Sequence, residues 1–281
     1  MQIIDPHLHL FDLSLGQYDW LRSGNAPHWR DKATIQRDFS DADLTLSAPH
    51  QLCGFVHVEA GFDNDAPWRE IAWLESTCAL PFKSIGCVDI TLPPSAFAKQ
   101  LAKLGQYQSL VGVRHILDSD AVTLLAMNTV HTNLKQIADA KLIFEAQFDA
   151  QDTGAVNAFI RMSNALPTLR LALNHAGFPP PEKHLEWDKN MKALAVLPSL
   201  SVKASGWEMS DRHYPLSTIQ DRLTSLVTLF GEDRIMLASN FPLTLFRARY
   251  DELWHDYLSL PYSEALLAKL CNENARRFYG F

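Results

Sequence analysis

Eight short apolar segments rich in β-branched residues alternate along the chain with amphipathic segments, which predicts a single-domain (β/α)8 barrel, the TIM barrel fold. The amphipathic segments carry apolar residues at i, i+3, i+4 and i+7, as helices packed on a sheet do. A doubly wound open sheet, the alternative, usually has a glycine-rich phosphate turn after its first strand. The sequence HLHLFD stands there instead, so the barrel is favoured.

The expected elements follow one another over residues 1–281 as one domain, with no internal repeat and no low-complexity linker. Strands are expected at 2–10, 53–60, 84–90, 109–117, 141–148, 169–177, 199–206 and 234–242. Helices are expected at 65–79, 93–105, 121–140, 153–166, 188–197, 216–231 and 263–280. The longest irregular stretch, residues 12–38, would lie over the C-terminal face of the barrel, where its Trp20 could contact a substrate.

Composition excludes several classes of protein. Of the 281 residues, 47% are hydrophobic and 20% charged, which is typical of a soluble globular protein. A formal net charge of −7 argues against nucleic acid or an anionic membrane as a partner. No signal peptide and no apolar stretch of roughly 20 residues is present. The four cysteines lack C-x-x-C spacing, which indicates reduced thiols in a cytoplasmic protein.

Two histidines stand one residue apart in the sequence DPHLHLF, residues 5–11. If this segment is a strand, His7 and His9 point to the same side, about 7 Å apart. The two rings are then close enough to converge on one ion or one substrate group. An isolated H-x-H is more often a pair of surface histidines. The residues of the other expected strands are therefore needed to distinguish the two interpretations.

Polar residues gather at the C-terminal ends of the expected strands, the face that carries the chemistry of a TIM barrel. Burying a polar side chain inside a barrel costs free energy unless it has a hydrogen-bond or ion-pair partner. The residues are His57, Glu59, Arg114, His115, Glu145, Gln147, His175, Lys203 and Asn240.

Each of these residues also has a structural interpretation. His57 fits a core histidine bonded to a backbone carbonyl, and this interpretation is favoured. Arg114 and Glu145 could form a structural ion pair at the barrel rim, and Lys203 could extend outward to solvent. Together, however, the H-x-H, Glu59 and His175 make a concave set of nitrogen and oxygen ligands. Such a set suits zinc or another divalent ion with one position open for water.

The motifs DPHLHLFD, YDWL, GVRH, NHAGFP, VKASGW, FGEDRIMLASNFP and NENARRFYGF occur in this order from Asp5 to Phe281. In this order they resemble the amidohydrolase-2 branch of the amidohydrolase superfamily, and more narrowly its sugar-lactonase and pyrone-dicarboxylate-hydrolase-like members. The resemblance implies a distorted TIM barrel that hydrolyses a cyclic ester. The expected substrate is a small molecule, typically an aldono-lactone of carbohydrate metabolism or a related carboxylated lactone. Barrel hydrolases of this kind are often oligomeric.

The resemblance also implies roles for individual residues. His7 and His9 match the family's H-x-H, which binds metal or polarises the substrate carbonyl, and His175 matches a histidine beside that carbonyl. Arg114 matches a position suited to a substrate carboxylate or hydroxyl, where its planar fork gives orientation. Further expected substrate contacts are His115, Trp20, Gln147, Lys203 and Trp207.

Position 240 departs from the family's pattern. Many members have Asp there, in an S-D-W-P sequence, and use it to deprotonate the attacking water. This chain has SNFP, and Asn240 cannot act as a base. The family's usual base therefore cannot be assigned to position 240, and tight metal binding cannot be carried over with it.

Two mechanisms fit these residues. In the first, a divalent ion, most naturally zinc, sits on His7, His9 and Glu59 with His175 and lowers the pKa of a bound water towards about 7. In the second, the three histidines donate hydrogen bonds to the carbonyl, and Glu59 or Glu145 takes the proton. The residues slightly favour a bound metal. They favour less strongly a metal that is essential for the reaction.

Two other functions remain open. Related barrels decarboxylate aromatic acids, but they keep the strand-eight Asp and usually have longer chains, which counts against this function. A non-catalytic barrel that binds a sugar acid would have lost its base at Asn240. Selectivity for the substrate is expected from residues 12–38 and from the segment GWEMSDRHYP, which contains Trp207.

Overall fold

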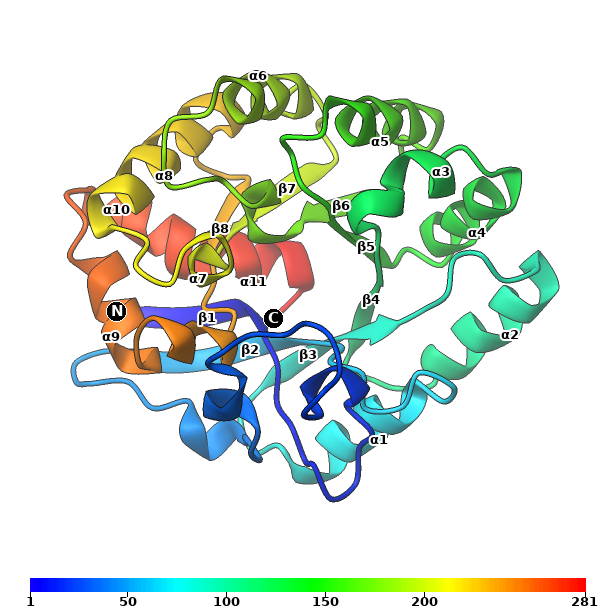
Figure 1. The fold of residues 1–281 in the computed structure, drawn as a ribbon, viewed down its shortest axis with the longest axis horizontal. Helices are drawn as coiled ribbons and strands as arrows, with labels where there is room; N and C mark the ends of the chain where they lie inside the picture. Colours follow the sequence, from blue (N-terminus) through cyan, green and yellow to red (C-terminus); the bar gives the residue numbers. More distant parts are fainter.

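The computed structural model describes all 281 residues and contains one sheet of eight parallel strands in the order β1 to β8. The strands form a ring with the helices outside it (Figure 1). They are β1 (Gln2–Leu8), β2 (Gln51–Val58), β3 (Phe82–Cys87), β4 (Leu110–Ile116), β5 (Ile143–Gln147), β6 (Arg170–Leu173), β7 (Leu200–Ala204) and β8 (Ile235–Leu237). The predicted TIM barrel is confirmed.

The ring closes irregularly between β8 and β1, as expected of a distorted barrel. Leu8 forms an isolated bridge with Phe241, and the amide of His9 donates to the carbonyl of Phe241 over 2.6 Å. The amide of Asn240 donates to the carbonyl of His7 over 2.9 Å. Closure therefore uses the residues just beyond β8, and it brings the H-x-H and Asn240 to one place.

Helices cover the outside of the barrel between the strands (Figure 1). They are α1 (Trp68–Thr77), α2 (Pro94–Leu104), α3 (Ala121–Leu124), α4 (Asn128–Asp139), α5 (Thr153–Ala165), α6 (Leu185–Leu194), α7 (Trp207–Ser210), α8 (Leu216–Phe230), α9 (Tyr250–Leu258), α10 (Glu264–Ala268) and α11 (Asn274–Tyr279). The π-helical turn Lys269–Glu273 joins the last two. None of the helices is long and apolar enough to cross a membrane.

Two regions differ from the expected elements. The segment 121–140, predicted as one helix, is divided into α3 and α4 because Met127 has an extended backbone (φ −78°, ψ 130°). The helix α9 is absent from the expected elements although it has amphipathic spacing, with Tyr250, Leu253, Trp254 and Tyr257 all buried. Its aromatic residues pack beside the closure of the barrel, where the Tyr250 ring lies 5.5 Å from that of Phe241.

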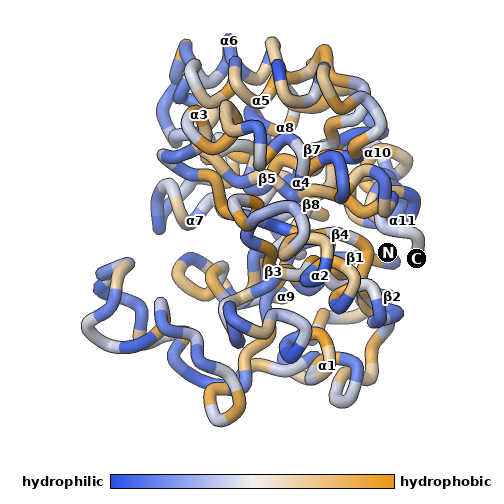
Figure 2. The backbone as a smooth tube through the Cα atoms, turned by 90° about the vertical axis from the view of Figure 1, so that its right-hand side faces the viewer, coloured by the Kyte–Doolittle hydropathy of each residue, from blue (hydrophilic) through white to orange (hydrophobic).

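The amino ends of the strands enclose a small apolar interior that the C-terminal helix closes. Nine buried residues form this interior, among them Ile4, Val56, Ile143 and Met236. The helix α11 adds Tyr279 to it, and both chain ends lie on the side of the molecule opposite α7 (Figure 2). Because this end is filled, a ligand has room only towards the carboxyl ends of the strands.

Residues 9–50 connect β1 to β2 without an α-helix and contain only short 3-10 turns, such as the turn Asp19–Leu21. A buried lysine holds this long loop together, since the ammonium of Lys32 donates to the carbonyls of Trp20 and Asn25, each over 2.7 Å. The loop is also tied to the segment after β7, because Arg212 donates to Asp31 over 2.7 Å. Its tryptophans are thereby held above the barrel.

Candidate active site

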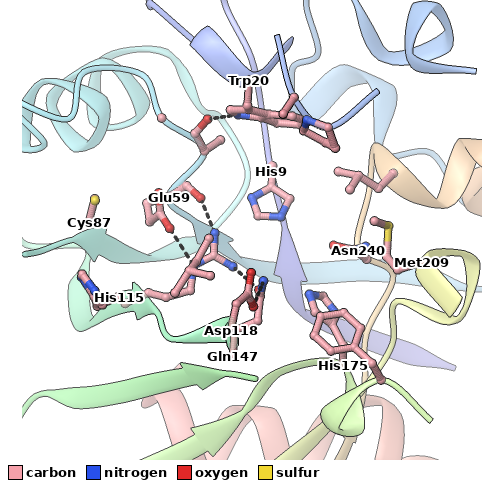
Figure 3. A pocket seen from close by; sticks show the side chains of 18 of the residues that line it. His9, Trp20, Glu59, Cys87, His115, Asp118, Gln147, His175, Met209 and Asn240 are labelled. Atoms are coloured by element: carbon pink, nitrogen blue, oxygen red, sulfur yellow. Dashed lines mark hydrogen bonds and ion pairs between the residues drawn. The ribbon is translucent and has the colours of Figure 1, made fainter. Parts of the chain in front are cut away.

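A cavity of about 1030 Å³ opens at the carboxyl ends of the strands, beneath the long loop (Figure 3). Trp29 of that loop and Phe178 supply part of its apolar wall. Of the residues predicted from the sequence, those that line it are His9, Trp20, Glu59, Arg114, His115, Gln147, His175 and Asn240. The other predicted residues, His7, Glu145, Lys203 and Trp207, are buried behind this lining.

Three histidines form a cluster at the floor of the cavity. The ring of His7 lies 5.1 Å from the ring of His9 and 4.5 Å from the ring of His175, measured between centroids. Burial is the largest cause that holds the pKa of each imidazole well below its usual range. The positive charge of Arg114 lowers all three pKa values further, and that of Lys203 lowers those of His7 and His175. The cluster is therefore neutral at pH 7.

The protonated nitrogen of His9 follows from its hydrogen bond. Nδ1 of His9 lies 2.7 Å from the carbonyl oxygen of Val58. A carbonyl oxygen only accepts hydrogen bonds, so Nδ1 carries the proton and Nε2 keeps a free lone pair. The ring lies in the middle of the cavity wall, between Trp20 and His175 (Figure 3). His9 thus presents a neutral basic nitrogen to any molecule in the cavity.

A turn of left-handed backbone positions His175 after β6. His175, Ala176, Gly177 and Phe178 have φ values of 54°, 49°, 63° and 55°. Each residue other than glycine costs roughly 1–2 kcal/mol in this region, so the surrounding contacts must stabilise the turn. One contact is the Trp187 indole N–H, which donates to the carbonyl of Ala176 over 3.0 Å. The turn directs the His175 ring towards the cavity rather than along the strand.

Gly206 makes room for this histidine. A Cβ atom at Gly206 would lie 2.5 Å from Nδ1 of His175, and the φ of Gly206 is 69°. The neighbouring residue Ser205 has its hydroxyl 3.0 Å from the same nitrogen. Ser205 and Gly206 of the VKASG motif therefore position His175 of the NHAG motif. Ser205 contacts its ring nitrogen, and Gly206 leaves space for the ring.

Arg114 lines the cavity between Glu59 and Gln147. Its guanidinium donates to the Glu59 carboxylate over 2.7 Å, to the Glu59 carbonyl over 2.8 Å and to the Gln147 side chain over 3.3 Å. A guanidinium has five N–H donors, so two remain for a ligand. Burial raises the pKa of the Glu59 carboxyl, while the charge of Arg114 opposes that rise. The predicted rim pair of Arg114 with Glu145 is wrong, because Arg114 pairs with Glu59.

Glu145 and Lys203 lie beneath the histidine cluster and pair with each other. The ammonium of Lys203 lies 2.6 Å from both carboxylate oxygens of Glu145, and 3.5 Å from Nδ1 of His7. The hydroxyl of Tyr279 donates to Glu145 over 2.9 Å. Neither Glu145 nor Lys203 reaches the cavity. This pair supports His7 from below, and Lys203 does not extend outward to solvent.

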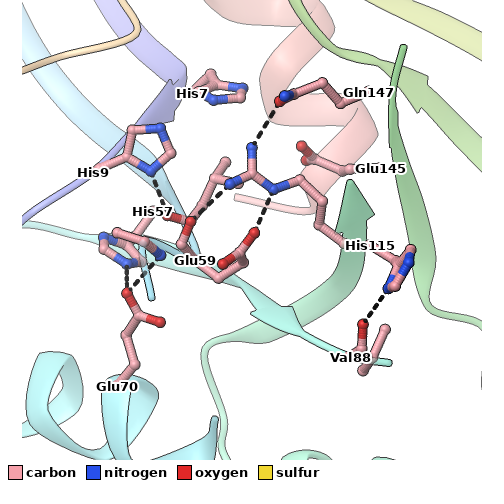
Figure 4. A network of polar contacts seen from close by, with 12 residues as sticks. His7, His9, His57, Glu59, Glu70, Val88, His115, Glu145 and Gln147 are labelled. Atoms are coloured by element: carbon pink, nitrogen blue, oxygen red, sulfur yellow. Dashed lines mark hydrogen bonds and ion pairs between the residues drawn. The ribbon is translucent and has the colours of Figure 1, made fainter. Parts of the chain in front are cut away.

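His57 is a core residue, as expected, but its partners are a backbone amide and a carboxylate and not the expected backbone carbonyl. The amide of Leu10 donates to Nδ1 of His57 over 3.2 Å, so Nε2 carries the proton and lies 3.0 Å from the Glu70 carboxylate (Figure 4). Glu70 also accepts from the amide of Ala60 over 2.8 Å. Both nitrogens of His57 are occupied by the scaffold behind the cavity.

Asn240 lines the cavity on the side opposite Glu59 (Figure 3). Its backbone is left-handed, with a φ of 58°. Its side-chain amide donates to the Glu208 carboxylate over 2.6 Å. Glu208, in the first turn of α7, is buried, and burial raises the pKa of its carboxyl to about 7. Glu208 is not among the site residues expected from the sequence, because its only signal there is a lone acid in a short segment that contains aromatic residues.

The other predicted substrate contacts divide between the cavity and the scaffold. The indole of Trp20 donates to the carbonyl of Ala60 over 2.7 Å, which fixes the tryptophan as a cavity wall. His115 lines the cavity and bonds the Val88 carbonyl through Nδ1 over 3.0 Å. Trp207 is buried and donates to the hydroxyl of Tyr257 over 2.7 Å, so it belongs to the scaffold.

A divalent ion needs several ligating side chains that converge on one point. No group of three or more His, Cys, Asp or Glu side chains is arranged in this way. The Glu59 carboxylate is occupied by Arg114, and the positive charge of the Lys203 ammonium lies beside His7, where it opposes a dication. As arranged, the predicted set of His7, His9, Glu59 and His175 therefore does not fit the ion.

Comparison with known proteins gives matches over nearly the whole chain. An uncharacterized protein of Sinorhizobium fredii is 29% identical over 99% of this chain and 98% of its own length. L-fucono-1,5-lactonase of Burkholderia multivorans is 26% identical over 89% of this chain and 85% of its own length. The structure of an amidohydrolase from Burkholderia multivorans, with bound zinc, has a TM-score of 0.80 at 22% identity, with full coverage of both chains.

The model of the amidohydrolase family, the amidohydrolase-2 branch, matches residues 4–281. This match includes the H-x-H, the NHAG turn and the SNFP sequence, the segments that meet around the cavity. The chain therefore belongs to the amidohydrolase-2 family.

Proposed function

We propose that the cavity hydrolyses a cyclic ester, in the first instance a sugar lactone. The observation that carries this proposal is the neutral imidazole of His9. Its Nε2 lone pair faces the cavity, and its tautomer is fixed by Val58. Lactone hydrolysis needs a base for water, a means to polarise the carbonyl and stabilisation of the oxyanion. The similarity to an L-fucono-1,5-lactonase supports a lactone over other small molecules.

In the proposed reaction, a water molecule attacks the lactone carbonyl carbon while Nε2 of His9 takes one of its protons. The carbonyl oxygen becomes an oxyanion, which the free N–H groups of Arg114 and the imidazole of His175 stabilise. The bond from this carbon to the ring oxygen then breaks. The ring oxygen takes the proton back from His9, and the product is an open-chain hydroxy acid.

The walls of the cavity suit a hydroxylated ring. Arg114 and Gln147 offer hydrogen-bond donors and acceptors on one side, while Trp20 and Trp29 offer apolar faces above. The volume of about 1030 Å³ lies at the upper end of the range for small-molecule sites. A monosaccharide lactone with several hydroxyl groups meets both kinds of wall. The aromatic walls supply contact area, and the polar groups select the orientation of the ring.

We propose that this reaction does not require a metal. Neither carboxylate of the predicted site is free for a dication, because Glu59 and Glu145 are each paired with a cation. Neither is assigned as the base, since Glu59 is held by Arg114 and Glu145 does not reach the cavity. We assign the proton to His9, whose free nitrogen lines the cavity. The zinc in the related structure makes this proposal one that a chelator can test.

The test is turnover of aldono-1,4- and aldono-1,5-lactones, L-fucono-1,5-lactone among them, in a weakly buffered pH-indicator assay. Hydrolysis releases an acid, and the assay reads it directly. Purified protein is assayed with zinc, with manganese and after chelation, beside the variant His9→Ala. The exposed histidine of α9 gives the matched control, His255→Ala. Turnover that survives chelation and His255→Ala but not His9→Ala is the expected result.

Two other outcomes would replace the proposal. Turnover that stops on chelation and returns with zinc would assign the reaction to a bound ion. Tight binding of a sugar acid with no turnover of any lactone would identify a binding barrel without catalysis.

A further inference from the structure

A buried carboxylate stands directly behind the cavity wall at Asn240. Oε1 of Glu208 lies 2.6 Å from Nδ2 of Asn240, and the Glu208 residue is 1% exposed. Asn240 itself lines the cavity, whereas Glu208 does not. The two residues come from different segments, one following β8 and the other following β7. The parallel pairing of β7 with β8 brings them together.

This contact fixes which end of the Asn240 amide faces the cavity. An ionised carboxylate only accepts hydrogen bonds, so the NH2 group of Asn240 must face Glu208. The amide oxygen is then turned away from Glu208. In the cavity it can accept a hydrogen bond from a water molecule close to His9, which lines the same cavity. Without the carboxylate, the two ends of the amide could exchange places.

The surroundings of Glu208 give its carboxylate no other side-chain hydrogen bond. Arg212 donates to the backbone carbonyl of Glu208 and pairs with Asp31. Arg247 donates to Asp256 over 3.2 Å and to the Tyr214 carbonyl over 3.0 Å. The third titratable neighbour, Tyr257, donates to the Ala238 carbonyl over 3.1 Å. A carboxylate buried only to support the scaffold would be expected to pair with one of these cations.

We propose that Glu208 is a positioning residue, which holds the amide of Asn240 so that Oδ1 orients the attacking water towards His9. The inference rests on the proposed lactone hydrolysis. In this proposal the pair of Glu208 and Asn240 aligns the water, and His9 accepts the proton. Asn240 touches the water, and Glu208 acts through Asn240.

The kinetic test compares Glu208→Gln with the exchanged pair Glu208→Gln/Asn240→Asp. In the single variant both side chains are amides, so neither end of Asn240 is preferred. The kcat of Glu208→Gln should fall about tenfold to a hundredfold, as for a misaligned reactant, while KM changes little. The exchanged pair again has one carboxylate and one amide in contact, and its kcat should be about tenfold higher than that of Glu208→Gln. Asn240→Asp alone puts two carboxylates in contact and should not gain this activity, whereas a new carboxylate at position 240 that acted as a base would give activity in both variants.

The matched control is Glu75→Gln, which removes the carboxylate that accepts from the Ser109 amide, at the other end of the barrel. Its kcat should equal that of the wild type. The proposal is overturned if Glu208→Gln keeps the wild-type kcat, or if the exchanged pair is no more active than Glu208→Gln. Thermal unfolding of each variant separates loss of alignment from loss of the fold.

A pH profile adds a readout that a purely structural role would not change. Burial raises the pKa of Glu208 to about 7, and a protonated Glu208 could donate to Oδ1 and turn the amide. The kcat of the wild type should therefore rise with pH through about 7, and this rise should be absent in Glu208→Gln. The charged and titratable groups that face Glu208 are Arg212, Arg247 and Tyr257. Burial raises the pKa of Tyr257 well above its ordinary range, so this tyrosine does not account for a change near pH 7.

One measurement does not depend on turnover. In NMR spectra, the side-chain amide signal of Asn240 is the one that disappears in Asn240→Asp. In the wild type its chemical shift should move with pH through about 7, and in Glu208→Gln it should stay constant. If no lactone is hydrolysed but this titration is seen, the proposed function fails and the pairing stands. An Asn240 amide signal that is identical in the wild type and in Glu208→Gln at every pH overturns the inference.

Discussion

Both carboxylate oxygens of Glu145 lie 2.6 Å from the ammonium of Lys203, and both side chains are completely buried. The pair lies under His7 and is completed by Tyr279 of the C-terminal helix. Removal of one partner of such a pair leaves a buried charge without compensation. Lys203→Met should therefore lower the free energy of unfolding by about 3–5 kcal/mol, measured by denaturant unfolding.

The double variant Lys203→Met/Glu145→Gln removes both charges and should recover much of this loss. The exposed i, i+4 pair of Lys135 and Asp139 gives the control, since Lys135→Met should change the free energy of unfolding little. Equal effects of Lys203→Met and Lys135→Met would show that the buried pair does not stabilise the barrel.

Gly206→Ala should reduce activity more than it reduces stability. The added methyl group would lie 2.5 Å from Nδ1 of His175, so the ring must move out of its place in the cavity. We expect kcat/KM for the lactone to fall about a hundredfold, because small displacements of reacting groups are costly. Steady-state kinetics and thermal unfolding are measured on the same preparation.

Gly280→Ala is the matched control for this substitution. Gly280 has the same left-handed conformation, with a φ of 73° and a ψ of 51°, but no atom within 4 Å of an added Cβ. It therefore reports the backbone strain alone. If both variants lose the same activity, the effect comes from strain and not from displacement of His175.

Arg114→Lys should raise KM and leave the fold intact. Lysine keeps a positive charge beside Glu59, but it cannot contact Glu59, Gln147 and a ligand with a planar fork. We expect KM for the best lactone to increase about tenfold or more, and kcat to fall as well because the oxyanion loses a donor. An unchanged KM would exclude Arg114 from substrate binding.

The stability of the protein should depend on the ionisation of Asp5. Burial raises the pKa of Asp5 from 3.8 to about 6, although Ser239, His7 and Tyr250 donate hydrogen bonds to it. Because the folded state keeps the proton, the stabilisation is present below pH 3.8 and is lost as the pH rises through about 6. At about 1.4 kcal/mol per pKa unit, the loss is about 3 kcal/mol.

The side chain of the variant Asp5→Asn cannot ionise. This variant should therefore not lose unfolding free energy through ionisation at position 5 as the pH rises. The difference in unfolding free energy between wild type and Asp5→Asn should therefore shift in favour of the variant between pH 3.8 and 6. Denaturant unfolding at several pH values gives this difference, in which all other titrating groups cancel. A difference that is constant with pH would show that Asp5 has an ordinary pKa.

Much of the barrel could be predicted from the sequence because its strands and helices have different hydrophobic periods. The segments around His7 and His175 each have the pattern of a short apolar strand with a histidine near its end. The irregular closure at Phe241 could not be predicted, because it depends on contacts between the two ends of the chain. The break at Met127 is likewise a matter of packing between α3 and α4, which the periodic pattern does not reveal.

In the site, parity along a strand predicts which side chains face inward but not how deep they lie. Glu145 and Gln147 share one face of β5, yet only Gln147 lines the cavity. Partners across the barrel are also hidden from the sequence, since Arg114 joins Glu59 from β2 while Lys203 joins Glu145 from β5. Glu208 could be recognised only when the fold placed it behind Asn240.

Chemical rescue by imidazole tests whether His9 is the base. The variant His9→Ala leaves a space at the cavity wall in which a free imidazole can bind. With chelator present throughout, added imidazole should restore lactone turnover to His9→Ala and leave Asn240→Ala unchanged. The restored rate should follow the fraction of neutral imidazole as the pH is varied. If imidazole restores nothing, and zinc is needed for turnover by the wild type, then His9 is a metal ligand and not the base.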